Sequence, residues 1–304
     1  MIDIRLREKL YDNIRNNCDV IADNGVQLEI NLNQIQLITL KLAIENYILK
    51  TLESYYERKF ERKNFLVESR DDILNLPNRT PNGAFYPKVE NIEEYNIIQS
   101  VVNDILDENG LINQLSSYDV CTVRVVDGEL TDLDSRLAAT AKLHSDAWSG
   151  HKGDAILTIA LLGDETTSLE FHKVVGEVSP SFFETQPSYE EGLHLFDDYE
   201  LLGKLKFNNI TIFDHACLHR TVKENGGLRV SVDFGITLST SKGVEKNTIF
   251  GRDVEHRTID EMLKLGKETF VEATETLEEC YNRFKDDKYD KVAVSHINDV
   301  IKVG

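Results

Sequence analysis

The feature that most constrains the fold is a change in the spacing of apolar residues near Tyr118. Before this point, apolar residues recur every three or four positions, which is typical of helices; we expect one from Gln34 to Arg62 and another from Ile92 to Leu106. After it, short segments rich in Val, Ile, Thr and Phe are separated by polar loops, which is typical of strands. Helical spacing returns between Thr258 and Phe284.

The expected strands all lie in the middle of the chain, at Tyr118–Val126, Ala155–Leu162, Leu205–Phe213 and Leu228–Leu238. No segment has the composition of a linker. We therefore expect a single domain of the α+β class over residues 1–304. It would have a helical part at about 1–117, a β-rich core at about 118–240 and a second helical part at about 241–304.

The net charge of the chain is −19, from 53 acidic and 34 basic residues. Such a surface repels a phosphate backbone, so we expect no nucleic-acid partner. An enzyme with this charge that uses a dicarboxylate must supply a local cation. The sequence has no apolar run of membrane-spanning length and its first residues lack the apolar core of a secretory signal, so we expect a cytoplasmic protein without a membrane partner.

The most informative residues are His144 and Asp146, in the run KLHSDAWSGH, and His219 further along the chain. In a strand, His144 and Asp146 would project to the same side, because alternate residues share a face. Two histidines and one carboxylate can occupy one face of an octahedral metal and leave three positions open for small molecules. This arrangement is typical of non-haem iron oxygenases.

Arg229 lies ten residues after His219 in the last expected strand, and Ser231 lies on the same side of that strand. A buried Arg is costly unless it meets a carboxylate, which its planar fork can grip through two parallel hydrogen bonds. Ser231 is placed to donate a hydroxyl hydrogen to the same carboxylate. The alternative is that Arg229 pairs internally with an acid such as Asp214 or Asp233.

Together, the His-x-Asp pair, the later His and the Arg-x-Ser pair resemble the motif of the iron(II)- and 2-oxoglutarate-dependent dioxygenase superfamily. The run FDHACLHRTVKENGGLRVSVDF is most similar to its phytanoyl-CoA-dioxygenase-like branch. The resemblance covers roughly Tyr118 to Leu238. It implies a double-stranded β-helix core (jelly-roll, cupin-like) flanked by the helical parts.

The resemblance also implies a set of ligands: Fe(II) held by His144, Asp146 and His219, and 2-oxoglutarate held by Arg229 and Ser231, with Thr221 in contact. The implied reaction is the hydroxylation, or another oxidation, of a small-molecule metabolite by O2, with conversion of 2-oxoglutarate to succinate and CO2. The presence of Asp146 favours hydroxylation, desaturation or ring formation, because related halogenases have a small residue at that position. The sequence does not indicate an oligomeric state.

The distal histidine has an alternative, because His215 lies only four residues before His219. We favour His219, since the preceding strand should end in a turn at Asp214–Ala216 and since the spacing from His219 to Arg229 matches the family motif. Thr221, two residues after His219, is also a position where family members often have a small hydroxyl residue.

Three further residues are candidates for the substrate pocket: Arg124, Trp148 and His172. Arg124 would supply a second cation to the substrate or the oxoacid. For Trp148, which follows the first motif, packing within a loop is an equal alternative.

Two other classes of protein use a similar site. A zinc-dependent hydrolase would hold its metal with the same three residues and a water molecule, but this leaves Arg229 without a role. A non-oxidative cupin-like isomerase or binding protein is the other alternative. Iron-dependent turnover of 2-oxoglutarate separates both from the dioxygenase.

Overall fold

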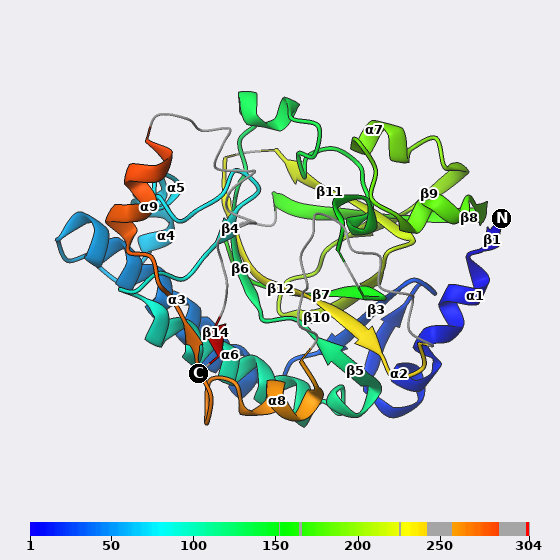
Figure 1. The fold of residues 1–304 in the computed structure, drawn as a ribbon, viewed down its shortest axis with the longest axis horizontal. Coiled ribbons are helices and arrows are strands. Elements are labelled where there is room, and N and C mark those ends of the chain that lie inside the picture. The colour runs from blue at the N-terminus through cyan, green and yellow to red at the C-terminus, as the bar shows by residue number, and fades with distance from the viewer. Residues whose placement is uncertain (152, 164–165, 225, 242–256, 286–301, 304) are drawn as a thin grey trace.

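The computed structural model describes residues 1–151, 153–163, 166–224, 226–241, 257–285 and 302–303 (Figure 1). Its helices are α1 (Arg5–Glu8), α2 (Asp12–Asn17), α3 (Gln34–Tyr56), α4 (Phe65–Glu68), α5 (Arg70–Leu74), α6 (Ile92–Glu108), α7 (Tyr189–Gly192), α8 (Ile259–Lys264) and α9 (Leu277–Phe284). In these residues, no helix combines the length and the apolar character needed to cross a membrane.

The strands form two antiparallel sheets and a short pair. The larger sheet has the order β2 (Val20–Asp23), β3 (Gln27–Asn31), β10 (Asn209–Asp214), β7 (Ala155–Gly163), β12 (Leu228–Leu238), β6 (Thr122–Asp127) and β4 (Ala84–Phe85), and β5 (Leu115–Tyr118) also pairs with β12. The smaller sheet contains β1 (Ile2–Asp3), β8 (Thr167–Val178), β11 (Cys217–Lys223) and β9 (Phe196–Lys204). The pair is β13 (Val271–Glu272) with β14 (Lys302–Val303).

The central strands have the connectivity of a jelly roll. From β6 onwards, the chain visits both sheets: β6, β7, β10 and β12 lie in the larger sheet, whereas β8, β9 and β11 lie in the smaller one. Between β6 and β7, His144 joins the edge of the smaller sheet through a single bridge to β11. This order confirms the expected double-stranded β-helix core, in which the described strands form two facing sheets and no closed barrel.

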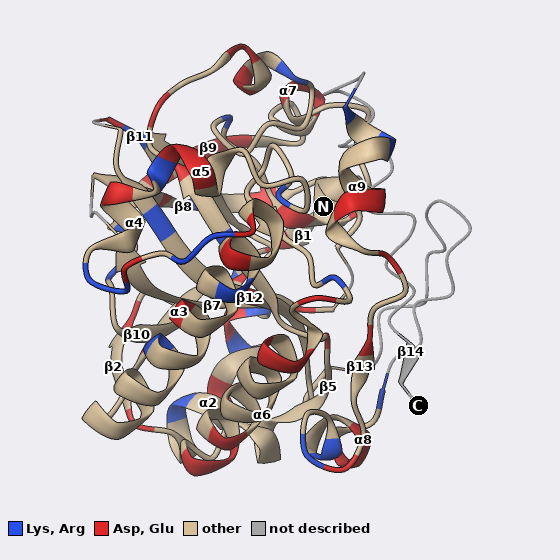
Figure 2. Ribbon diagram, turned by 90° about the vertical axis from the view of Figure 1, so that its left-hand side faces the viewer, with Lys and Arg blue, Asp and Glu red and all other residues tan. Residues whose placement is uncertain are grey.

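Helices α3 and α6 lie side by side on the outer face of the larger sheet (Figures 1 and 2). Apolar side chains from this face, such as Val230 and Val232, form one core with the helices. A second core lies between the two sheets and contains Phe171 of the smaller sheet and Phe213 of the larger. Because alternate residues of a strand face opposite sides, β12 contributes to the helical core with one set of residues and faces the smaller sheet with the other.

Helix α3 begins where the sequence provides a cap. The Asn33 side chain accepts hydrogen bonds from the backbone N–H groups of Ile35 and Gln36, and the Gln36 side chain accepts one from the Asn33 N–H. The expected helix to Arg62 is too long, because the chain leaves the helix at Glu57, which has a left-handed φ of 52°. The helix expected from Ile92 is confirmed and ends at Glu108.

Two sequence-based expectations about the helical parts were wrong. The first 117 residues also contain β2 and β3, which extend the larger sheet through the pairing of β3 with β10. The helix expected from Thr258 to Phe284 is divided into α8 and α9. Between them, Gly266 adopts a φ of +80° against the backbone of α6, and β13 follows.

Gly163, at the end of β7, provides a test of this architecture. It has a φ of +111°, and a Cβ atom there would lie 1.7 Å from the backbone oxygen of Leu228 on β12. We expect Gly163→Ala to lower the free energy of unfolding by about 3 kcal/mol or more, because it combines backbone strain with a clash. Gly176→Ala is the matched control, since its φ is +85° but nothing lies within 4 Å of the added atom. Equal losses for the two variants in urea unfolding would show that the contact between β7 and β12 is not tight.

Candidate metal centre

The two candidate histidines are placed against each other by the backbone. His144 and His219 form an antiparallel bridge in which each N–H donates to the other's carbonyl oxygen, at 3.0 and 2.8 Å. The sequence predicted that Asp146 lies in a strand with His144. In the structure, Asp146 instead begins a short 3₁₀ helix at Asp146–Ser149. Ser145 caps this helix by accepting a hydrogen bond from the Ala147 N–H, and its hydroxyl donates to the His215 carbonyl at 2.6 Å.

The three side chains converge despite the change in backbone structure, and their ligand atoms all lie within 4.8 Å of one another. Nε2 of His144 lies 4.0 Å from Oδ1 of Asp146, and Nε2 of His219 lies 3.4 Å from Oδ2. Nδ1 of His144 lies 2.8 Å from the Lys142 carbonyl oxygen, so this nitrogen carries the hydrogen and Nε2 keeps its lone pair. The donor set therefore fits a divalent metal bound by two imidazoles and one carboxylate.

The electrostatics of these groups favour metal binding at neutral pH. Burial, and next the neighbouring His219, lower the pKa of His144 to about 3, and burial also lowers the pKa of His219. Burial alone would raise the pKa of the Asp146 carboxyl, but His219 and His151 hold it below its ordinary value. At pH 7 the site therefore presents two neutral imidazoles and a carboxylate, the forms that bind a metal.

His219, and not His215, is the histidine that meets Asp146 in this cluster. His215 is buried next to it, and neither of its ring nitrogens has a hydrogen-bond partner in the described part of the chain. Its backbone carbonyl, which accepts the Ser145 hydrogen bond, is the atom that links it to the His-x-Asp motif.

A cavity of about 120 Å³ opens beside the three side chains, between the two sheets. Arg124, Thr221, Arg229 and Asp233 also line this cavity. The Arg229 side chain is only 1% exposed, yet its Nε and Nη1 atoms have no hydrogen-bond partner in the regions that the structure describes. Burial lowers the pKa of Arg229 to about 10, so the side chain still carries its charge at neutral pH.

Neither internal acid that was considered for Arg229 is available to it. Asp214 accepts hydrogen bonds from Arg7 and from the Tyr11 hydroxyl, at 2.9 and 2.7 Å. Asp233 is paired with Arg124. Among the described residues no carboxylate forms an ion pair with Arg229, and a buried cation of this kind, in the same cavity as the candidate metal ligands, is the strongest indication of an anionic ligand.

Three predicted site residues have other roles in the structure. The Ser231 hydroxyl donates to Oδ1 of Asp233 at 2.9 Å, so its hydrogen is not directed at an oxoacid. Trp148 is buried against Phe182 and donates its indole N–H to the Phe182 carbonyl, so packing is its role. In both cases a tertiary partner engages the polar group of the side chain.

His172 is the third of these residues. It is the neighbour of Phe171, which faces the space between the sheets, so the pleat of β8 directs His172 to the outer face. There its Nε2 is 2.9 Å from Glu170 and its ring packs against Tyr199. It does not line the cavity.

Tyr189 is a neighbour of the site that could not be selected from the sequence. Its ring stacks on His144, with centroids 4.3 Å apart and planes at 8°. We expect Tyr189→Leu to weaken Co²⁺ binding roughly 3–10-fold and Tyr189→Phe to leave it nearly unchanged, because an aromatic pair contributes about 0.5–1.5 kcal/mol. Absorbance titration with Co²⁺ measures this effect. Tyr199→Leu, which removes a ring from the outer His172, is the control; an equal loss there would contradict the prediction.

Comparisons with known proteins find structural similarity but no close relative. No protein-family model matches the sequence, and no curated protein matches it. The structure is similar to SnoK, a non-heme α-ketoglutarate-dependent carbocyclase from nogalamycin biosynthesis (TM-score 0.38, 8% identity, 79% of this chain and 87% of SnoK).

Two further solved structures come from Streptomyces. One is HygX of Streptomyces hygroscopicus with nickel and 2-oxoglutarate bound (TM-score 0.34, 14% identity, 84% of this chain and 98% of HygX). The other is AviO1 of Streptomyces viridochromogenes Tue57 (TM-score 0.33, 13% identity, 77% of this chain and 96% of AviO1). Similarity at this level does not assign a reaction to the chain.

Proposed function

We propose that this protein is an iron(II)- and 2-oxoglutarate-dependent dioxygenase that oxidises a small-molecule metabolite. The observation that carries the proposal is the unpaired, buried guanidinium of Arg229 in the cavity that also holds His144, Asp146 and His219. Two imidazoles and one carboxylate leave coordination positions open, which suits a metal that must also bind a cosubstrate and dioxygen. A zinc hydrolase with the same ligands has no use for Arg229.

Each residue of the site has a defined part in this function. His144, Asp146 and His219 would hold the iron, and Arg229 would bind the distal carboxylate of 2-oxoglutarate through its planar fork. The hydroxyl of Thr221, which lines the same cavity, would contact the oxoacid. With iron bound, the centre would supply the oxidising chemistry for a C–H bond while 2-oxoglutarate is converted to succinate and CO2. The walls of the cavity between the two sheets would orient the reactants.

The run from Phe213 to Phe234 leads us to place the chain in the phytanoyl-CoA-dioxygenase-like branch, and hydroxylation is the outcome that we favour. The proposal needs a small-molecule substrate only, with no nucleic-acid or membrane partner. Since Arg124 is paired with Asp233, we do not assign it to direct contact with an anionic substrate.

The test is the conversion of 2-oxoglutarate to succinate by the purified protein with Fe(II) and O2. Uncoupled turnover without substrate is slow in such a reaction, so the anaerobic Fe(II) complex with 2-oxoglutarate should also be followed by its visible charge-transfer absorption. A panel of candidate metabolites should then be added one at a time, and the compounds that perturb this band would identify the substrate class. Absence of both the band and succinate formation, with Fe(II) bound, would reject the proposal.

A further inference from the structure

The charge arrangement around Arg229 presents a structural problem. Asp233 lies four residues after Arg229 on the same face of β12, and both side chains line the cavity. The Asp233 carboxylate is near enough to raise the pKa of Arg229, and a direct ion pair between the two would remove the cost of the unpaired guanidinium. Yet Nε and Nη1 of Arg229 have no partner among the described residues.

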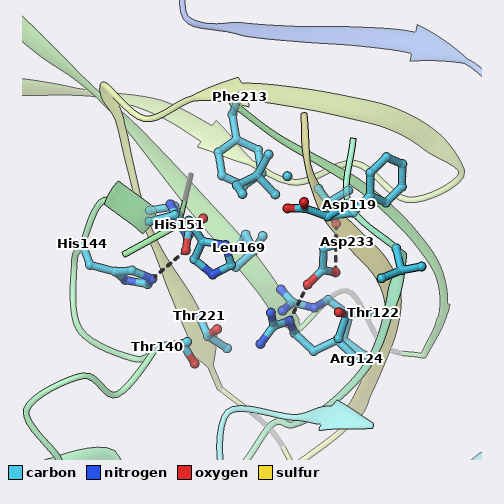
Figure 3. Close-up of a pocket in the computed structure, with 18 residues that line it drawn as sticks. Asp119, Thr122, Arg124, Thr140, His144, His151, Leu169, Phe213, Thr221 and Asp233 are labelled. Atoms are coloured by element: carbon cyan, nitrogen blue, oxygen red, sulfur yellow. Dashed lines mark hydrogen bonds and ion pairs between the residues drawn. The ribbon is translucent and has the colours of Figure 1, made fainter. Parts of the chain in front are cut away.

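Asp233 is instead held by other donors. Its Oδ2 accepts a hydrogen bond from Nε of Arg124 at 2.5 Å, and its Oδ1 accepts one from the Ser231 hydroxyl at 2.9 Å. The Thr158 hydroxyl lies at 3.5 Å from the same Oδ1. Both oxygens are therefore engaged by donors other than Arg229, and a dashed line in Figure 3 marks the contact with Arg124.

Arg124 is itself fixed in this position. It lies on β6 directly opposite Ser231 in the pairing of β6 with β12, so its side chain reaches Asp233 diagonally across the two strands. Its Nη1 donates to the backbone carbonyl of Asn82 at 3.0 Å, which ties the second arm of the guanidinium to the chain before β4. The guanidinium cannot change its orientation without losing both contacts.

We propose that Arg124 is a positioning residue that holds Asp233 away from Arg229 and thereby keeps the Arg229 guanidinium open to a carboxylate ligand. This inference rests on the proposed function, in which that carboxylate belongs to 2-oxoglutarate. Without Arg124, the Asp233 carboxylate is released next to Arg229 and competes with the ligand for the same hydrogen-bond donors. Arg124 therefore supports anion binding through Asp233, without touching the anion.

A simple charge effect makes a different prediction. If Arg124 helped an anion only by adding positive charge to the cavity, its removal would weaken binding by the same factor whether or not position 233 carried a carboxylate. If Arg124 acts by restraining Asp233, its removal matters only while Asp233 is present. A double-mutant cycle separates the two.

The experiment uses Arg124→Gln, Asp233→Asn and the double variant, each loaded with Zn²⁺ and titrated with 2-oxoglutarate by calorimetry. We expect Arg124→Gln alone to weaken binding about tenfold or more, and the same change in the Asp233→Asn background to alter it by less than about threefold. An equal loss in both backgrounds would overturn the inference. If Arg124→Gln alone does not fold, a loss of about tenfold or more between Asp233→Asn and the double variant would still overturn the inference, whereas a loss below about threefold would support it.

The controls distinguish this inference from the proposed function. If the unaltered protein binds Zn²⁺ but not 2-oxoglutarate, the proposed function fails; if it binds 2-oxoglutarate and the cycle is additive, only the role of Arg124 fails. Zn²⁺ affinity should be the same in all four proteins, since none of the changes touches the metal ligands. Arg124→Lys, which keeps the charge but cannot hold both Asp233 and Asn82 with the same fork, is expected to bind 2-oxoglutarate with intermediate affinity.

Discussion

Asp146→Ala protein is expected to lose Fe(II) binding and, with it, all measurable conversion of 2-oxoglutarate to succinate. The Asp146 carboxylate contributes the only negative charge of the three-residue cluster and lies within 4.0 Å of both histidines. Changes to residues that only support metal ligands reduce metal affinity about 10–100-fold, so loss of a ligand should exceed roughly 100-fold. Anaerobic titration with Fe(II), followed by a succinate assay, measures both effects.

The matched control for this change is His172→Ala. It also removes a polar side chain from the jelly-roll core, but from the outer face of β8, so Fe(II) affinity and succinate formation should be unaltered. Turnover by the Asp146→Ala protein at a normal rate would show that the metal is held elsewhere. A loss in His172→Ala equal to that in Asp146→Ala would show that the assay reports folding.

Arg229→Met is expected to have opposite effects on ligand binding and on stability. Truncating one partner of a buried charge pair typically costs about 2–5 kcal/mol, so 2-oxoglutarate affinity should fall roughly 30-fold or more. In the protein without ligand, however, Arg229 is a buried cation with no acidic partner among the described residues. An apolar side chain of similar length avoids this desolvation, so the melting temperature of the ligand-free variant should rise.

Thermal unfolding with and without 2-oxoglutarate, in the presence of Zn²⁺, measures both effects. The ligand should raise the melting temperature of the unaltered protein but have little effect on Arg229→Met. Arg229→Lys serves as the control for charge, since it keeps a cation but not the planar fork, and it should bind 2-oxoglutarate with intermediate affinity. Unchanged binding in Arg229→Met would exclude this residue from the cosubstrate site.

The sequence predicted the strand-rich core well, because its strands carry strong local signals. The bounds of β12 agree with the expected Leu228–Leu238, and α6 begins at the expected Ile92. The β-strands at Val20–Asp23 and Gln27–Asn31 were missed, because both are short: the first pairs with the second, and the second pairs with β10, which follows about 180 residues later. Such long-range pairing leaves little trace in local spacing.

In the candidate site, too, some features could be predicted from local sequence and others depend on distant segments. The convergence of His144, Asp146 and His219 could be predicted from spacing, although Asp146 reaches the cluster from a 3₁₀ helix and not from a strand. The role of Ser231 could not, because it depends on where Arg124 places Asp233. Residue types predicted which chemistry the site holds, whereas the partners of each hydrogen bond were decided by contacts between distant segments.

The contact between Arg7 and Asp214 has a consequence for the order in which this site is assembled. Arg7 and Tyr11 hold the carboxylate at the turn between β10 and β11, and that turn precedes His219 by only a few residues. These partners are separated by more than 200 residues, so the loop between them closes at a large entropic cost. Contacts of such high sequence separation form slowly. During synthesis, the segment around Arg7 leaves the ribosome long before its partner exists, so we expect the turn that leads to His219 to be fixed only after the two have met.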